Sequence, residues 1–349
     1  MINISKIKGL TLIEILVALV ISFLALGALY ESYLAILRAK KQQEKIAETN
    51  FQVLMALEFL RKDIELAGFG MPRDISISNL TYEEAISSST CSPDYFNSST
   101  NSTPKPIDLG GNYCNNSDYL VIRSSAANLD KNTSRKWAYT YYDGSGWRIT
   151  SLGTLDFSTN DRCVALDHQK SLINWNFSCN NFSGSNISEI YYLFGINDSP
   201  LRMPFNRVDY FLKKPSSLPY RCYQATYELY RGEIQHSNGD VNEQPILDCV
   251  LSFQVIVGRD TNNDNIIDAW SKDLSSLSAT QVFEEVKEID IYIIYQEGQR
   301  ERKEVFDSDI IRINYPDGTY DDINIPSKNY RWKLIEIKVK PFNLEDIKL

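Results

Sequence analysis

The sequence predicts an α+β protein in which one long N-terminal helix packs on a head built from an antiparallel β-sheet. Three observations predict this class. The run 10–30 is apolar except for Glu14, helix-forming residues without proline continue to residue 67, and strand-like segments recur from residue 119 to the end. We therefore expect a short basic segment at 1–9, a long helix at 10–67 and a head at 68–349.

The apolar run 10–30 is long enough to cross a bilayer, because about 20 helical residues span the hydrocarbon layer. Lys6 and Lys8 precede it, so we expect the N-terminus in the cytoplasm and the head outside. A secretory signal peptide is one alternative, but the length of the run and the lack of a small-residue cleavage site after it argue against this. A plain anchor is the other alternative, but it gives no reason for an acid that costs about 2.5–3.5 kcal/mol in a membrane.

The string Lys8-Gly9-Leu10-Thr11-Leu12-Ile13-Glu14 resembles the class III leader of type IV pilins and type II secretion pseudopilins. The resemblance implies that a prepilin peptidase cuts after Gly9 and that the new N-terminus, Leu10, is N-methylated. The family's acidic fifth mature residue falls on Glu14. The first mature residue is usually Phe in the family and is Leu here.

A physical argument gives Glu14 the same role. Cleavage creates a charged amine at Leu10 within the apolar layer, and the carboxylate four residues on can neutralise such an amine on a neighbouring subunit. Opposite charges attract strongly in a low dielectric, and an unpaired charge is costly there. We therefore interpret Glu14 as an assembly residue that sets the axial register between subunits.

The second half of the helix carries an apolar stripe. Apolar residues recur there at helical spacing, at Val53, Leu57, Leu60 and Ile64, with Leu54 beside them. This pattern predicts that the stripe docks on the head. Residues 31–50 are more charged, and we expect them to pack on other subunits. Gly68 and Gly70 should end the helix, with a proline after them.

The helix exit adds a narrower resemblance. Residues 60–70 contain Asp63-Ile64 followed by Ala67-Gly68-Phe69, which is similar to a string common in PilW-type minor pilins. The length of the chain also favours a minor pilin, since major pilins are usually shorter than 349 residues.

The composition disfavours several classes of function. The chain has 36 basic and 45 acidic residues, a net charge of −9, and no basic cluster outside the leader. Binding to a phosphate backbone needs concentrated Lys and Arg, so we expect no dedicated nucleic-acid binding. No nucleophile elbow, phosphate-binding loop or zinc-protease motif occurs, so we do not expect an enzyme.

All six cysteines lie in the expected head, and an even number beyond a membrane anchor favours disulfide bonds. Nearness in the sequence favours the pairs Cys91–Cys114 and Cys163–Cys179, which leaves Cys222–Cys249. A zinc site is disfavoured, because no Cys-x-x-Cys pair exists and only two histidines are present.

The head should be mostly β-structure with two polar loops. Turn-forming residues crowd 87–106 and 174–188, which we interpret as surface loops. The strands we expect are 119–124, 136–142 paired with 147–150, 223–230, 251–257, 289–296, 309–313 and 330–340.

A loop after the strand 251–257 has the spacing of a calcium site. Oxygen donors stand at the first, third, fifth, seventh (a backbone carbonyl) and ninth positions of an EF-hand-like register: Asp260, Asn262, Asp264, Ile266 and Asp268. Calcium takes about six to eight oxygen ligands. PilW-like proteins often carry a similar string at this place.

Two departures affect this calcium site. Asn265 replaces the usual glycine, which is tolerable because Asn adopts the left-handed conformation. Ser271 stands where an EF-hand has a bidentate Glu, and Asp273, Glu284 or Glu285 are the candidates to replace it. The alternative is an Asp- and Asn-rich turn without a metal.

The leading hypothesis is a minor pilin that primes assembly at the tip of a type IV pilus together with other minor and major pilins. A type II secretion minor pseudopilin is the first alternative, and a tip adhesin that binds surfaces or glycans is the second. We expect the chain in the inner membrane before assembly and at the pilus tip afterwards.

Overall fold

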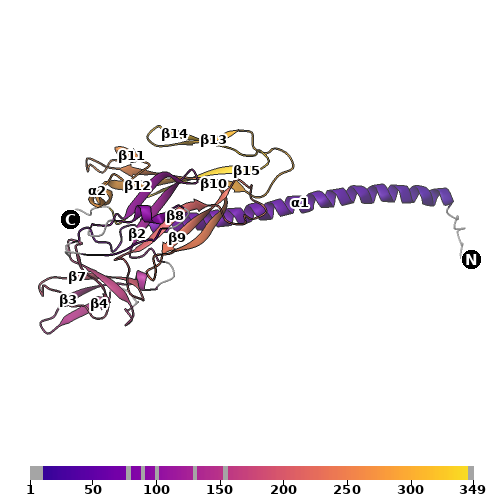
Figure 1. Cartoon of the computed structure of the whole chain (residues 1–349). Coiled ribbons are helices and arrows are strands. Elements are labelled where there is room, and N and C mark those ends of the chain that lie inside the picture. Colours follow the sequence, from indigo (N-terminus) through magenta and orange to yellow (C-terminus); the bar gives the residue numbers. More distant parts are fainter. Residues whose placement is uncertain are drawn as a thin grey trace, which may run out of the picture.

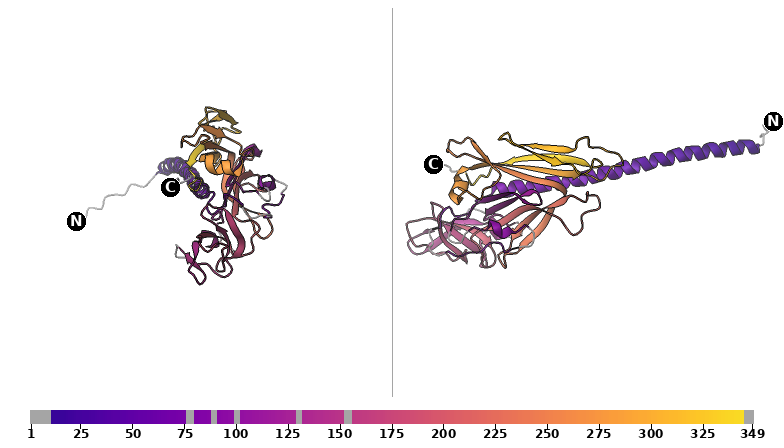
Figure 2. Two further views of the ribbon diagram at one scale, coloured as in Figure 1. Left: turned by 90° about the vertical axis from the view of Figure 1, so that its left-hand side faces the viewer. Right: turned by 45° about the horizontal axis from the view of Figure 1, so that its top comes forward.

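One long helix and a β-rich head make up the computed structural model (Figure 1). The structure describes residues 11–75, 80–87, 91–98, 102–128, 132–151 and 156–344. Helix α1 (Leu12–Glu65) has 54 residues, which corresponds to about 80 Å at 1.5 Å per residue. Its N-terminal half projects from the head, and its C-terminal half lies on the head (Figures 1 and 2). The predicted α+β class with a long N-terminal helix is confirmed.

An antiparallel sheet of eight strands forms the body of the head. Seven strands pair in the order β1-β2-β8-β9-β10-β12-β15, and β11 pairs with β10. Their bounds are β1 (Ile107–Cys114), β2 (Ser117–Ser124), β8 (Asn206–Lys213), β9 (Tyr227–Ile234), β10 (Val241–Arg259), β11 (Ala269–Ser271), β12 (Val286–Glu297) and β15 (Arg331–Val339). Because β2 pairs directly with β8, residues 125–205 leave this sheet between two neighbouring strands and return to it.

The second half of α1 packs on one face of the eight-stranded sheet. Val53, Leu60 and Ile64 are at most 5% exposed, and Leu57 packs against the same core. Burying each such side chain contributes about 1.5–3 kcal/mol. The predicted docking stripe is therefore confirmed, while Leu54 beside it is 66% exposed.

Residues 125–205 contain a second, smaller sheet, which we call the inserted sheet. Figure 1 places β3, β4 and β7 at the end of the head far from the N-terminus. Its five antiparallel strands pair in the order β4-β3-β7-β5-β6. They are β3 (Trp137–Tyr142), β4 (Trp147–Ser151), β5 (Arg162–Leu166), β6 (Leu172–Ser178) and β7 (Tyr191–Asn197), after the short 3₁₀ helix η2 (Asn132–Arg135).

The inserted sheet corrects one expectation about the loops. The segment 174–188 begins with strand residues of β6, and its Phe182 is 5% exposed in a core built around the Cys163–Cys179 disulfide. The polar residues Asn174 and Asn176 hide this strand from pattern reading. A short strand needs only a few buried side chains when a disulfide and aromatic rings close its core.

The second polar stretch is also partly built into the fold. Residues 93–96 form the 3₁₀ helix η1 (Pro93–Phe96), and Phe96 is 3% exposed with its ring stacked 4.8 Å from that of Tyr119. The described part of 87–106 is therefore irregular apart from η1, as a loop is expected to be, but Pro93 and Phe96 are buried rather than on the surface. Residues 88–90 and 99–101 lie outside the described residues. Aromatic residues inside the polar string anchor it to the sheet.

A buried charged cluster lies under this covering segment. Glu84, fully buried, accepts hydrogen bonds from Arg123 Nε and Arg207 Nη1, both at 2.9 Å. Arg207 also bonds both carboxylate oxygens of Asp209 at 2.8 Å. Burial opposes ionisation of Glu84, but the two guanidinium groups hold its pKa below the usual value. Pairing of this kind makes buried charges tolerable.

The expected strands are present with shifted ends. The fourth begins at Tyr227 instead of residue 223, and β10 begins at Val241 instead of residue 251. Elements that the sequence reading missed are β1, β5, β6, β7, β8, β11, the hairpin strand β14 (Tyr320–Asn324) that pairs with β13 (Ile310–Asn314), and helix α2 (Ala279–Glu285). Strand β8 was missed because its buried ion pair reads as a polar surface pattern.

The helix exit and the disulfides follow the sequence-based expectations. Gly68 and Gly70 have φ of +78° and +65°, the left-handed conformation that ends helices and that side chains disfavour. The structure joins Cys91 to Cys114, Cys163 to Cys179 and Cys222 to Cys249, the pairs that nearness in the sequence favours.

Candidate functional site

The first turn of α1 contains the acid that the sequence singles out. Thr11 is the N-cap, and Glu14 Oε2 accepts hydrogen bonds from the backbone N–H and the hydroxyl of Thr11, both at 2.8 Å. The Thr11 hydroxyl accepts in return from the backbone N–H of Glu14 at 3.4 Å. This capping box places the carboxylate at the positive end of the helix dipole. Gly9 and Leu10, the predicted cleavage residues, lie outside the described residues.

The N-terminal half of α1 exposes its apolar side chains on all sides. Every residue from 11 to 33 is exposed, including Phe23 and Leu24, each 70% exposed. By length and composition α1 is a candidate membrane span. An apolar surface of this extent requires a lipid or protein environment.

A polar cluster holds the middle of α1 on the head. Arg221 donates to Thr49 Oγ1 at 2.7 Å, to Gln52 Oε1 at 2.8 Å and to Asp248 Oδ2 at 2.9 Å. The Cys222–Cys249 disulfide joins the residues next to Arg221 and Asp248, so the guanidinium has a fixed support. This cluster sets where along its length the helix meets the head.

A buried ion pair holds the C-terminal part of α1. Asp63 Oδ2 accepts from Arg231 Nε and from the hydroxyl of Tyr210, both at 2.7 Å, and Arg231 also pairs with Glu233. Burial alone would lower the pKa of Arg231, but the neighbouring acids raise it, so the guanidinium stays charged. Removing one partner of such a pair costs about 3–5 kcal/mol.

The expected calcium loop is closed by its own hydrogen bonds. The carboxylate of Asp260, 1% exposed, accepts from the backbone N–H groups of Asp264 at 3.1 Å and Asn265 at 2.7 Å. Asp268 Oδ1 accepts from the backbone N–H of Thr261 at 2.9 Å. Asn265 has φ of +68°, the left-handed conformation expected for the position that is usually glycine.

The structure also bears on the ligands that could complete the loop. Glu285, one candidate, is paired with Arg259 at 2.6 Å, and Asp273 accepts a backbone hydrogen bond from Ser275. Within the described ranges, no three His, Cys, Asp or Glu side chains converge as a metal-binding group. The expected ligands of the loop also include the side chain of Asn262 and the carbonyl of Ile266, which are not among those residue types, so calcium binding by the loop stays a prediction.

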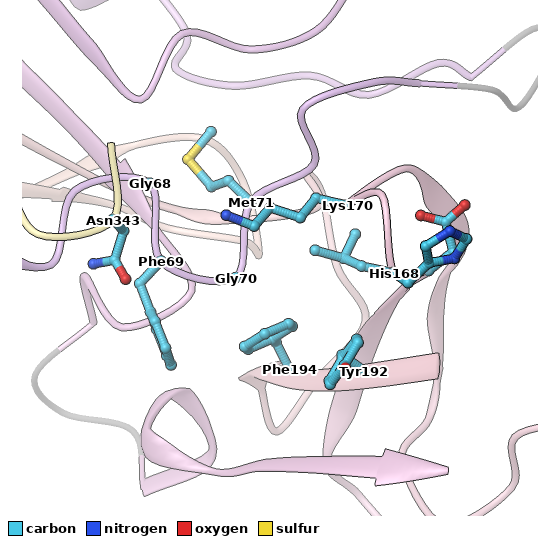
Figure 3. A pocket seen from close by; sticks show the side chains of 11 residues that line it. Gly68, Phe69, Gly70, Met71, His168, Lys170, Tyr192, Phe194 and Asn343 are labelled. Atoms are coloured by element: carbon cyan, nitrogen blue, oxygen red, sulfur yellow. The ribbon is translucent and has the colours of Figure 1, made fainter. Parts of the chain in front are cut away.

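A pocket of about 330 Å³ lies between the helix exit and the inserted sheet (Figure 3). Phe69, Met71 and Phe194 give it apolar walls, His168 stands at one side, and the side chain of Lys170 extends toward Met71. The rings of Phe69 and Phe194 meet edge to face at 5.3 Å. The pocket therefore marks where the inserted sheet rests on the end of α1.

Beyond this pocket the inserted sheet has an exposed aromatic face. Tyr139 lies opposite Tyr192 in the pairing of β3 with β7. Trp137 and Tyr141, two residues before and after Tyr139, point to the same side because strand side chains alternate. Trp137, Tyr141 and Tyr192 are 37%, 39% and 37% exposed. We call these four residues the aromatic face.

Comparison with known proteins supports the interpretation of the N-terminus. Residues 4–30 match the family model described as the prokaryotic N-terminal methylation motif. The chain therefore carries a class III prepilin methylation motif at the start of a long hydrophobic helix, as pilin-like proteins do. The motif implies processing by a prepilin peptidase, and pilins are a structural class that is normally without enzymatic activity. Neither a curated protein nor a solved structure matches the chain.

The residues that join the helix to the head were not found by sequence reasoning. Asp63 carried a signal, because it is an acid beside Ile64 on the apolar stripe of α1. A charged residue on a docking face predicts a buried partner. No feature of the sequence marked Arg231 or Arg221, since a basic residue in a strand or a loop is usually exposed to solvent.

Proposed function

We propose that the chain is a minor pilin of a type IV pilus, made in the inner membrane with its N-terminus in the cytoplasm. The observation that carries the proposal is the methylation motif on a helix whose first half has an uncovered apolar surface. Such a surface suits a bilayer first and the core of a filament afterwards. The large head with three disulfides suits a rare tip subunit that primes assembly with other minor and major pilins.

Processing and assembly depend on different residues in this proposal. The prepilin peptidase cuts after Gly9, Leu10 is N-methylated, and Glu14 pairs with the terminal amine of a neighbouring subunit. In the chain before cleavage the carboxylate is held by Thr11. Both of these hydrogen bonds come from a residue in the same helix turn. Glu14 can therefore exchange them for the terminal amine of a neighbouring subunit once cleavage has created that amine.

The variant Glu14→Ala tests this assignment. We expect cleavage at Gly9 to proceed, as read by a mobility shift, and incorporation into pili to fall strongly. Glu31→Ala is the matched control, since Glu31 is an exposed acid on the same helix. Normal incorporation of Glu14→Ala, or an equal defect in Glu31→Ala, would contradict the charge-pair role.

We also propose that the loop 260–268 binds calcium. The support is the spacing of Asp260, Asn262, Asp264, Ile266 and Asp268 together with the left-handed Asn265. Ligand linkage raises the free energy of unfolding by about 1.4 kcal/mol when free calcium is about tenfold above its Kd. Calcium should therefore raise the melting temperature of the full chain in detergent, and Asp264→Ala should lose the rise. A melting curve that does not change with EGTA would sink the proposal.

A type II secretion pseudopilin is the alternative with the same anchor. Deletion of the gene separates the two roles. We expect loss of surface pili with normal secretion of exported enzymes, whereas the reverse result would assign the chain to the secretion system.

The aromatic face favours adhesion as a second function. Exposed rings on one side of a sheet, at the end of the head far from the membrane helix (Figure 1), can stack on apolar faces of sugar rings. Replacing Trp137 and Tyr141 by Ala should reduce adhesion to glycan-coated surfaces and leave piliation intact. The control is Tyr220→Ala, which removes an 84% exposed ring elsewhere. Unchanged adhesion of the double variant would contradict this function.

A further inference from the structure

A basic groove lies where the head meets the middle of α1. It has a volume of about 870 Å³ and runs between residues 38–46 of the helix and the segment 299–305. Five basic side chains line it, Arg38, Arg300, Arg302, Lys303 and Arg331, and the only acid among the lining residues is Glu301. Arg300, Arg302 and Lys303 are close together in the sequence, which the expectation of no basic cluster outside the leader overlooked. The fold adds Arg38 and Arg331 from two other segments.

The single acid of this groove is already used. Glu301 Oε1 accepts from Gln42 Nε2 at 3.0 Å and lies 3.1 Å from Arg331 Nη2. Within the part of the chain that the structure describes, no ion pair involves the other four basic residues of the groove. Asp309 raises the pKa of Lys328, and Glu304 and Asp307, the next acids along the segment, add to this increase. The groove therefore presents a surplus of positive charge.

The segment 299–305 is held against α1 at its start. The backbone N–H of Gly298 donates to Thr49 Oγ1 at 3.3 Å, and Gln42 Nε2 contacts the carbonyl of Gln299 at 3.4 Å. Gly298 has φ of +75°, and a Cβ there would meet the side chains of Gln42 and Ile46 at 3.0 and 3.1 Å, so glycine is favoured at this close approach. The basic side chains of 299–305 are thus held beside residues 38–46 of α1.

The level of residues 38–46 coincides with the membrane surface when the apolar half of α1 spans a bilayer. Arg38 follows Tyr30, the end of the uninterrupted apolar run, by about 12 Å at 1.5 Å per residue. Phosphate headgroups occupy roughly 5–8 Å beyond the hydrocarbon layer. A long arginine side chain covers the remaining distance. In Figures 1 and 2 the segment between β12 and β13 is the part of the head that reaches furthest along α1 toward its N-terminus.

We propose that this basic groove binds the phosphate headgroups of anionic lipids in the leaflet from which the head projects. The inference rests on the proposed membrane-spanning role of α1 and adds a second attachment, by the head itself. Each basic residue near an anionic leaflet strengthens attachment by about fivefold at low salt. The head is held against the membrane before assembly, and extraction into a filament breaks these contacts.

Hydrogen exchange on the full chain in lipid nanodiscs tests the proposal. Nanodiscs of phosphatidylcholine are compared with nanodiscs that also contain phosphatidylglycerol. We expect backbone exchange in 299–305 to slow by about fivefold or more with the anionic lipid, and this difference to vanish at high salt. Exchange in the core strand β10 should be equal in both discs and serves as the measure of intact folding.

Two matched double variants make the result specific. Arg300→Gln with Arg302→Gln should lose the lipid-dependent slowing, whereas Arg148→Gln with Arg312→Gln, which removes two exposed arginines outside the groove, should keep it. Equal exchange in both kinds of nanodisc overturns the proposal. Slowing by inorganic phosphate in phosphatidylcholine discs overturns the lipid assignment, and so does slowing that occurs only in assembled pili.

The readout is separate from the pilus role. A chain that shows lipid-dependent protection but never enters pili would contradict the proposed function and leave this inference standing. A chain that enters pili but shows no lipid-dependent protection would contradict this inference and leave the proposed function standing.

Discussion

The two halves of α1 form one continuous helix in opposite surroundings. Every residue from 11 to 33 is exposed, whereas Val53, Leu60 and Ile64 are at most 5% exposed. The first half is apolar around its whole circumference, and the second is apolar on one stripe. A helix that is apolar on all sides needs an apolar medium, while a one-sided stripe needs one partner surface. The head therefore supplies a partner surface for only one half of its own helix.

The largest effect should come from breaking the buried ion pair of the docked half. Asp63→Ala leaves Arg231 buried without its main partner, so we expect the free energy of unfolding to fall by about 3–5 kcal/mol. Urea unfolding of the full chain in detergent measures this change. Glu58→Ala is the matched control on the same helix, because its exposed pair with Arg61 contributes less than about 1 kcal/mol. Similar losses for both variants would remove the distinction between buried and exposed faces.

A pair of leucines sharpens the same comparison. Leu60 is 0% exposed and Leu54 is 66% exposed. Leu60→Ala should lower the free energy of unfolding by about 2–5 kcal/mol, because it leaves a cavity in the core. Leu54→Ala should change it by less than about 0.5 kcal/mol. If Leu54→Ala proved as costly in the isolated chain, the assignment of docked and free faces would be wrong.

Acid should lower the free energy of unfolding of the head through a buried histidine, a kind of group that the exposed N-terminal half of α1 does not contain. His236 is buried, its Nδ1 accepts the backbone N–H of Arg202 at 3.1 Å, and its Nε2 lies 3.0 Å from Asn206 Oδ1. Burial lowers the pKa of His236 to about 4, below the unfolded value of about 6.5. The unfolded chain therefore takes up the proton first, and stability falls by about 3 kcal/mol as pH drops from about 6.5 to about 4.

The control for this pH effect must allow for Asp118, whose protonation changes stability in the opposite direction. Burial raises the pKa of Asp118 to about 6, so its protonation in the folded state adds stability as pH falls below that value. The difference between the unfolding curves of His236→Gln and the parent chain isolates the histidine. A difference that stays constant between pH 7 and pH 4 would contradict its role.

The smallest change in stability is expected at the N-terminal end of α1. Thr11→Val removes both side-chain hydrogen bonds of the capping box, which costs the first turn about 0.5–2 kcal/mol locally. Amide exchange at Glu14 should become faster, while the melting temperature of the head stays unchanged. Unchanged exchange at Glu14 would mean that the cap does not hold the helix start.

Sequence reasoning succeeded where the signal is periodic or local. The stripe of α1, the glycines of its exit, the closing strand and the disulfide pairs all depend on spacing within a few tens of residues. It failed at β8, where Arg207 and Asp209 read as a polar segment but are buried as a pair. It also failed at Phe96 and at β6, because loop-forming composition outweighed a few aromatic anchors.

The candidate sites divide in the same way. The acid Glu14 and the loop 260–268 are visible as patterns, whereas the aromatic face and the basic groove require strands and segments to be placed side by side. Arg38 and Arg300 are far apart in the chain, and no spacing rule relates them.

A membrane-length helix with an acid at its start, a docking stripe, paired cysteines and a β-rich head can all be predicted from the order of the residues alone. These features are local, and the physics of a helix period or a short loop is enough to predict them. How the helix is attached to the head is visible only in the folded chain, where Arg231 bonds to Asp63 and Arg221 bonds to Thr49. Folding also brings Arg38 and Arg331 beside the basic residues of 300–303. Such contacts join residues that are distant in the chain, so their energies exist only once the strands are ordered in a sheet.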